Sequence, residues 1–254
     1  MTSFLSFQNV SLSFHTKEKE TQVLSDLSFH VNQGEFVALV GPSGCGKSTI
    51  LNLISGLIRP EHGAILLNDV PIEKSTDTIG YMLQKDHLFP WRTILDNIML
   101  GPEIQQKKTQ EKLAYAKQLL SDYGLAGFEK SKPSQLSGGM RQRAALIRTL
   151  IMEPSILLLD APFSALDYQT RLSVSDDIGN IIKKHSITAI LVTHDISEAI
   201  SMADRVIILS NRPAHVQLEL PIQLTIENRT PFNSRSAPEF QGYFNQIWKE
   251  LNIS

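Results

Sequence analysis

A glycine-rich segment in the first fifth of the chain has the residue types that bind phosphate. It fits the pattern G-x-x-x-x-G-K-[ST] and lies between an apolar run at residues 36–40 and a helical pattern, the context that this motif requires. Glycines permit a tight turn, backbone amides surround the phosphates, a lysine meets the β- and γ-phosphate charge, and a serine hydroxyl can ligate Mg²⁺. With every element present, a glycine-rich turn without a ligand is the weaker interpretation. The segment consists of Gly41, Pro42, Ser43, Gly44, Cys45, Gly46, Lys47, Ser48 and Thr49.

Cys45 occupies a variable position of this motif, and we expect no catalytic or redox role for it.

A carboxylate ends a second apolar run. Asp160 follows residues 156–159, which are all Ile or Leu. Parallel sheets place ligand groups at the carboxyl ends of their strands, so we expect Asp160 to hold Mg²⁺ through water, together with Ser48. A merely structural strand-end aspartate is the alternative, and the phosphate-binding segment upstream disfavours it.

A second serine-glycine turn precedes a predicted helix. Ser137, Gly138 and Gly139 come directly before Met140, and apolar residues then recur with helical spacing. Free amides and the helix dipole make such an N-terminus favourable for a phosphate. One chain with two phosphate-binding surfaces and a single nucleotide loop suggests that the second surface serves a nucleotide held by another copy.

The elements that must position these residues follow from the apolar pattern. Continuous apolar runs predict strands buried on both faces of a mainly parallel sheet, at 36–40, 156–159, 189–192 and 206–209. Intervening helices are predicted at 47–57, 139–152, 166–184 and 197–202, which gives a layered α/β core. Residues 4–14 and 23–31 predict antiparallel strands.

The chain is expected to form one domain, residues 1–254. Its core would comprise about 1–88 and 135–225, with an inserted helical subdomain at about 89–134 that contains an amphipathic helix at 107–120. A short tail at about 226–254 would carry one helix near 238–251.

Composition limits the function classes. The chain has 254 residues and a net charge of −2, which gives no reason to expect a nucleic-acid or anionic-membrane partner. A single cysteine excludes an internal disulfide and fits a reducing compartment. We expect no signal peptide, and no apolar run is long enough to span a membrane.

Together these segments resemble the ATP-binding cassette (ABC) ATPases, over nearly the whole chain. The resemblance implies a P-loop NTPase core, ATP and Mg²⁺ as ligands, and a homodimer that holds ATP between the glycine-rich loop of one copy and Ser137–Gly139 of the other. Gln84 takes the place of a glutamine that touches Mg²⁺ and the attacking water. The segment Ser164–Asp167, which includes Asp167, resembles a loop that communicates across the dimer in this family. His194 resembles the switch histidine that senses the γ-phosphate.

Phe14 matches the aromatic residue, usually a tyrosine, that stacks on adenine in this family. The alternative is that Phe14 only continues the alternation of its strand. Base–aromatic stacking is worth roughly 1–3 kcal/mol.

One position departs from the family pattern. A glutamate that polarises the attacking water is expected directly after Asp160, and the residue here is Ala161. A methyl group can neither accept a proton nor orient water, so we expect hydrolysis to be impaired. Either the residue was replaced to retain an ATP-bound state, or the subunit is naturally degenerate; the first is favoured because every other motif is intact.

Weaker features resemble the nitrate, sulfonate and taurine importer ATPases: residues 88–97 around Trp91, Met rather than Gln at position 140, and residues 246–251 around Trp248. The resemblance implies a bacterial importer subunit at the cytoplasmic face of the membrane, bound to permease subunits and served by an extracellular solute-binding protein. Trp91 could contact the permease or belong to the subdomain core. The rival functions are a non-transport ABC-type ATP switch and a catalytically inactive regulatory subunit.

Overall fold

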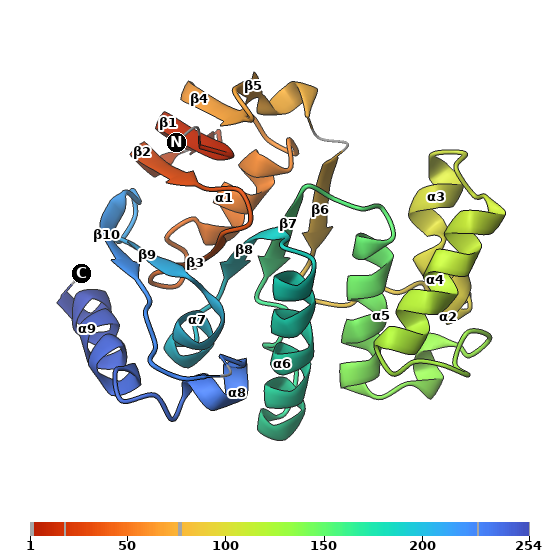
Figure 1. Cartoon of the computed structure of the whole chain (residues 1–254). Coiled ribbons are helices and arrows are strands. Elements are labelled where there is room, and N and C mark those ends of the chain that lie inside the picture. Colours follow the sequence, from red (N-terminus) through yellow and green to blue (C-terminus); the bar gives the residue numbers. More distant parts are fainter. Residues whose placement is uncertain (1–2, 18, 76–77, 228, 254) are drawn as a thin grey trace.

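The computed structural model describes residues 3–17, 19–75, 78–227 and 229–253; the first and last residues of the predicted domain therefore lie outside the described part. Two β-sheets and the helices around them form an α/β fold (Figure 1). The predicted fold class is confirmed: a mostly parallel sheet is combined with an antiparallel N-terminal sheet and helices. Within the described residues, no helix is both long enough and apolar enough to cross a bilayer.

The smaller sheet is antiparallel, with the strand order β2-β1-β4-β5. Strands β1 and β2 confirm the two strands predicted near the N-terminus, whereas β4 and β5 were not predicted from the sequence. Their bounds are Leu5–His15 (β1), Glu20–Val31 (β2), His62–Leu67 (β4) and Val70–Pro71 (β5).

The larger sheet has the order β10-β9-β3-β8-β7-β6, and all of its strands are parallel except β10. The four predicted apolar runs form its central strands. The bounds are Phe36–Val40 (β3), Ile79–Met82 (β6), Ile156–Asp160 (β7), Thr188–Val192 (β8), Arg205–Leu209 (β9) and Val216–Pro221 (β10).

The larger sheet is buried on both faces, which explains why its strands are continuously apolar. Along β3, Val37 and Leu39 pack with helix α1 (Lys47–Ile54) and the smaller sheet. Phe36, Ala38 and Val40 pack on the opposite face with α5 (Gly138–Leu150), α6 (Tyr168–Lys184) and α7 (Ile196–Met202). Helix α1 therefore lies between the two sheets, as Figure 1 shows.

Residues 94–122 form three helices beside α5, at one end of the molecule in Figure 1. They are α2 (Ile94–Ile98), α3 (Leu100–Ile104) and α4 (Gln110–Asp122), and two of them begin with a threonine cap. The buried side chain of Asn97 bonds to the backbone of Phe89, which ties the preceding loop to α2.

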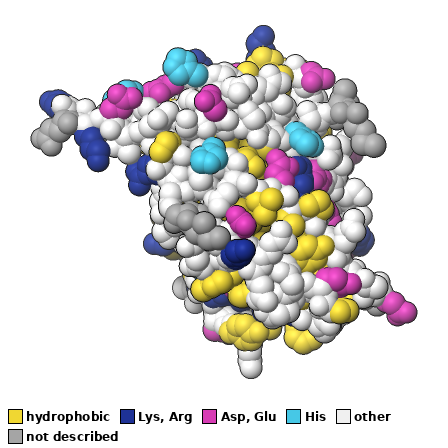
Figure 2. Space-filling view, turned by 90° about the vertical axis from the view of Figure 1, so that its left-hand side faces the viewer, with side chains coloured by type: hydrophobic (Ala, Val, Ile, Leu, Met, Phe, Trp, Pro, Cys, Tyr) yellow, Lys and Arg dark blue, Asp and Glu magenta, His cyan; other side chains and the backbone are white. Residues whose placement is uncertain are grey.

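The expectation of a single helix in the tail is wrong. A short helix α8 (Pro231–Ser234) precedes α9 (Phe240–Ile253), because Thr230 caps its first turn and Pro231 is pre-organised for a first helical position. Helix α8 packs on α6 and α7. On the face shown in Figure 2, hydrophobic side chains gather in the lower half, the level of α9 in Figure 1.

Candidate functional site

The glycine-rich loop connects the end of β3 to helix α1. Gly44 and Gly46 have φ angles of 75° and 118°, a region that favours glycine. A Cβ on Gly46 would also lie only 2.8 Å from Val23 Cγ1. No side chain caps α1, so the amides of its first turn are available to an anion.

Lys47 lies along this loop. Its Nζ donates hydrogen bonds to the carbonyl oxygens of Gly41 at 2.8 Å and Pro42 at 2.7 Å. The neighbouring Cys45 is only 1% exposed and packs in the core around α1, so its thiol has no access to solvent. The two carbonyls hold the ammonium group of Lys47 at the loop, where phosphate oxygens would need it.

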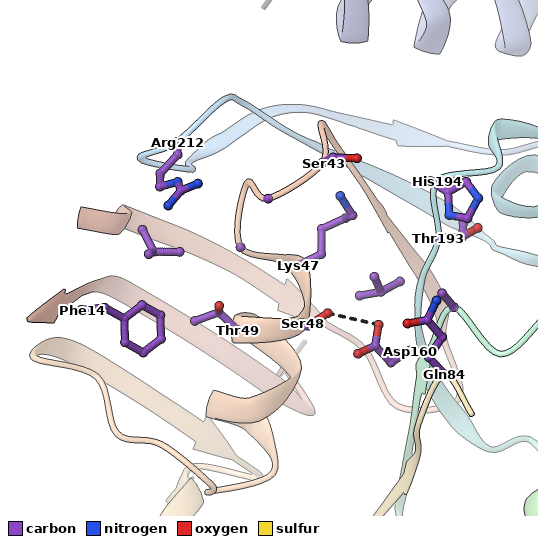
Figure 3. A pocket seen from close by; sticks show the side chains of 15 residues that line it. Phe14, Ser43, Lys47, Ser48, Thr49, Gln84, Asp160, Thr193, His194 and Arg212 are labelled. Atoms are coloured by element: carbon purple, nitrogen blue, oxygen red, sulfur yellow. Dashed lines mark hydrogen bonds between the residues drawn. The ribbon is translucent and has the colours of Figure 1, made fainter. Parts of the chain in front are cut away.

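Ser48 and Asp160 bring two oxygen donors together from α1 and β7. Ser48 Oγ donates a hydrogen bond to Asp160 Oδ1 at 3.2 Å, drawn as the dashed line in Figure 3. Burial raises the pKa of Asp160, while the hydrogen bond from Ser48 and the charge of Lys47 act in the opposite direction. A hydroxyl and a carboxylate are ligands that Mg²⁺ prefers, so this pair fits the ion that usually accompanies ATP. When bound there, the ion would neutralise phosphate charge.

These residues line a cleft of about 480 Å³ (Figure 3). Asp160 is its only carboxylate among the described residues that line it. The lining residues are Phe14, Val23, Ser43, Gly44, Gly46, Lys47, Ser48, Thr49, Gln84, Asp160, Ala161, Val192, Thr193, His194 and Arg212.

Gln84 and His194 lie on the Asp160 side of the cleft, whereas Phe14 lies at the far side in Figure 3. Gln84 Nε2 donates to Ser164 Oγ at 3.1 Å, and Ser164 Oγ donates to the carbonyl oxygen of Ala161 at 2.9 Å. Phe14 is 46% exposed rather than buried with the core of its sheet. Its position in the cleft is the one that contact with a nucleobase would require.

Ala161 lines the cleft directly after β7. Its φ angle is 43°, and its amide donates to the carbonyl oxygen of Val192 at 2.8 Å. The left-handed conformation is unusual for a residue with a Cβ. Position 161 therefore borders the cleft, but its methyl group supplies no proton acceptor.

Seven of the predicted nucleotide-binding residues do not line the cleft: Gly41, Pro42, Cys45, Ser137, Gly138, Gly139 and Asp167. Ser137 caps α5 by accepting a hydrogen bond from the amide of Met140 at 3.3 Å. A Cβ on Gly138 would lie 3.3 Å from Leu166, so this turn contacts the loop Ser164–Asp167. Asp167 itself caps α6 through the amide of Thr170. Within one chain, Ser137–Gly139 therefore lie outside the cleft that contains the glycine-rich loop.

Val23, Val192, Thr193 and Arg212 line the cleft but were not identified from the sequence. Arg212 belongs to the loop between β9 and β10, and the sequence contained a pattern that could have identified this loop. Residues 206–209 were predicted as a parallel strand, and the carboxyl ends of parallel strands share one edge of a sheet. The residues that follow such a strand therefore lie near the phosphate-binding loop.

Comparison with known proteins decides the family. Residues 24–164, more than half of the chain, match the family described as ABC transporter. This chain belongs to the ABC transporter ATP-binding family. The uncharacterized ABC transporter ATP-binding protein YtlC of Bacillus subtilis is 45% identical over 250 residues, covering 98% of this chain and 96% of the relative.

Other members of the ABC family extend the comparison. The aliphatic sulfonates import ATP-binding protein SsuB of Bacillus cereus is 39% identical over 238 residues, covering 93% of this chain and 91% of the relative. The dimeric ABC cassette MJ0796, in a post-hydrolysis state bound to ADP and Pi, matches with a TM-score of 0.75 and 29% identity, covering 86% of this chain and 99% of that one.

An apolar surface follows β6 and lies outside the ABC nucleotide cleft. We call Phe89 and Trp91 the aromatic surface. Trp91 is 69% exposed, and the two rings stack with centroids 5.0 Å apart. Trp91 therefore does not belong to the core of the helical subdomain, which removes one of its two predicted roles. Leu88, by contrast, is only 7% exposed.

Proposed function

We propose that this chain is the ATP-binding subunit of a bacterial importer of small solutes, and that it works as a homodimer closed by ATP. The observation that carries the proposal is that the predicted phosphate-binding groups of one chain lie in two separate places. The cleft contains Lys47, Ser48 and Asp160 but not Ser137–Gly139. A second copy would supply the missing turn.

In such a dimer, each ATP lies between Gly41–Thr49 of one copy and Ser137–Gly139 of the other. The free amides at the start of α5 favour the γ-phosphate, and Ser137 can donate from its hydroxyl. The dimeric ABC cassette MJ0796 supports this arrangement, because 99% of its chain aligns with this chain. ATP then stabilises the closed pair, and loss of the γ-phosphate weakens it.

We further propose that hydrolysis by this chain is slow. Asp160 accepts a hydrogen bond from Ser48, and Ala161 offers no acceptor for a proton of the attacking water. Gln84 and His194 remain as polar groups that can orient water, but neither is a carboxylate. Ala161 equally favours a second candidate function, a regulatory ABC subunit that binds ATP without turnover.

The aromatic surface is the proposed contact with an integral membrane permease at the cytoplasmic face of the membrane. Trp91 is exposed in this chain, stacks on Phe89 and follows the segment that carries Gln84, so a permease segment bound there would be close to the cleft. The relative SsuB, named as an import protein, supports an importer over a non-transport switch. An extracellular solute-binding protein would then act through the permease.

The test is dimerisation in MgATP, measured by light scattering at micromolar protein. The unaltered chain should be dimeric with ATP and largely monomeric with ADP. Ser137→Arg should abolish the dimer and leave ATP binding by the monomer intact, since position 137 contributes only in trans. Ser137→Asp should do the same while retaining a residue that caps α5 well, because its charge repels the γ-phosphate.

A nearby control is Ser134→Arg, which places the same charge at an exposed serine outside the turn. This variant should still dimerise. A monomer in the unaltered protein at saturating MgATP, or a dimer that persists in both position-137 variants, would contradict the proposal.

A further inference from the structure

Arg212 is a second cation beside the phosphate-binding loop. It lines the same cleft as Lys47, and a Cβ built on Gly44 would lie 3.5 Å from Arg212 Nη2. In Figure 3 the phosphate-binding loop lies between Arg212 and Lys47, and the guanidinium group points toward the loop. Its charge is therefore placed against the backbone that surrounds a bound phosphate.

The loop that carries Arg212 is held at both ends. Ser210 and His215 pair through a backbone hydrogen bond of 3.1 Å, and Ser210 Oγ accepts from the amide of His215 at 3.0 Å. Ala214 is fully buried and bonds to β2: its amide donates to the carbonyl oxygen of Val23 at 2.8 Å. Because Val23 itself contacts the region of Gly46, this loop has a fixed position relative to the phosphate-binding loop.

The guanidinium group has no competing partner inside the protein. Across the described ranges of the chain, Arg212 forms neither an ion pair nor a hydrogen bond from its side chain. Lys47 and Asp160 line the same cleft and are already engaged, Lys47 with backbone carbonyls and Asp160 with Ser48. An exposed cation without a carboxylate, held beside a phosphate site, is suited to an anionic ligand.

We propose that Arg212 binds the polyphosphate of the nucleotide, as a cation additional to Lys47. This inference rests on the proposed ATP binding and adds a residue that discriminates ligands by phosphate charge. Arginine suits this role because its planar guanidinium can donate two parallel hydrogen bonds to phosphate oxygens. The contact strengthens binding of ATP more than of ADP, and of ADP more than of AMP.

The experiment is calorimetric titration of ATP, ADP and AMP into the unaltered chain and Arg212→Ala. The expected loss for ATP is about three- to tenfold, because an exposed pair is weaker than a buried one. The loss should be smaller for ADP and smallest for AMP, and higher salt should reduce the difference between the proteins. Arg212→Lys should recover part of the ATP affinity because it restores the charge.

Arg59→Ala is the matched control, since Arg59 is also an exposed arginine but does not line the cleft. It should bind all three nucleotides as the unaltered chain does. Thermal unfolding without nucleotide should be unchanged in Arg212→Ala, because the side chain is exposed and makes no contact that supports the fold.

Equal losses for ATP, ADP and AMP would overturn the proposal, since they would place Arg212 at the base or ribose. No loss for ATP would overturn it as well. If Lys47→Ala weakens ATP binding and Arg212→Ala does not, only this inference fails. If the unaltered chain binds no ATP at all, the proposed function fails, and the role of Arg212 with it.

Discussion

Thr193, which directly precedes His194, donates a hydrogen bond from Oγ1 to Glu198 Oε2 at 2.6 Å. Glu198 is 5% exposed, and Arg171 Nε lies 3.8 Å from its other oxygen. Arg171 also pairs with Asp195 at 3.3 Å and donates to the carbonyl oxygen of Leu166 at 3.3 Å. A buried polar group thus connects the segment of His194 with the loop Ser164–Asp167.

The first prediction concerns pH. Burial raises the pKa of Glu198 to about 7. Between pH 4.5 and 7 the folded chain keeps a proton that the unfolded chain has released, so this group's contribution to stability is complete below about pH 4.5 and is lost as the pH rises through 7. Glu198→Gln keeps an acceptor for Thr193 and removes the titration. The free energy of unfolding of Glu198→Gln minus that of the unaltered chain should be larger at pH 8 than at pH 5, by about 1–3 kcal/mol.

Urea denaturation at the two pH values measures this difference. Glu198→Ala is the control, because it removes the acceptor as well and should lose stability at both pH values. Parallel pH profiles for the unaltered chain and Glu198→Gln would show that Glu198 does not titrate in this range.

The second prediction concerns the phosphate-binding loop. Gly46→Ala combines a φ of 118° with a Cβ that would lie 2.8 Å from Val23 Cγ1. The variant should lose stability and most of its ATP affinity, because the loop must shift. Gly127→Ala is the matched control: its φ is 85°, but no atom lies within 4 Å of the added Cβ. It should show only the backbone penalty of about 1 kcal/mol and normal ATP binding. Equal effects of the two substitutions in thermal unfolding and ATP titration would contradict this reading.

The third prediction concerns the aromatic surface. Trp91→Ala should leave the free energy of unfolding nearly unchanged, because the side chain is 69% exposed. It should impair co-purification with the permease and spare ATP binding. Leu88→Ala provides the contrast, since this buried side chain should cost about 2–5 kcal/mol on truncation. A loss of comparable size for Trp91→Ala would show that its ring supports the fold instead.

Much of this architecture was predictable because it depends on patterns within short stretches of the sequence. The apolar runs of β3, β7, β8 and β9 identified the parallel sheet, since strands buried on both faces have no polar alternation. Strands β4 and β10 were missed because each is partly exposed and pairs at an edge or with a distant segment. Their existence depends on tertiary partners that no local pattern reveals.

The same distinction applies to the cleft. Lys47, Ser48 and Asp160 were predicted because their motifs and flanking elements are local. The strand predicted at 206–209 could have placed the segment of Arg212 at the edge of the sheet that carries the cleft. Its position beside Gly44 also depends on the bridge between Ala214 and Leu24 of β2, a contact across 190 positions of the chain that no local pattern reveals. The exposure of Trp91 likewise required the structure, since aromatic residues suit a core and a binding surface equally.

The most direct test of the account is the rate of ATP hydrolysis after Ala161→Glu. Position 161 already has a Cβ in its left-handed conformation, so the substitution adds no new backbone strain, and its side chain lines the cleft. General base catalysis contributes about 10²–10⁴-fold, and restoring a carboxylate should raise turnover at least about tenfold. Nucleotide affinity should remain within a few-fold, since Lys47 and Ser48 are unchanged, and the ATP-bound dimer should be shorter-lived. Ala161→Gln, which can orient water but is a poor base, should stay slow. Turnover by the unaltered chain equal to that of Ala161→Glu would contradict the account, and another group, with His194 tested first, would then have to orient the water.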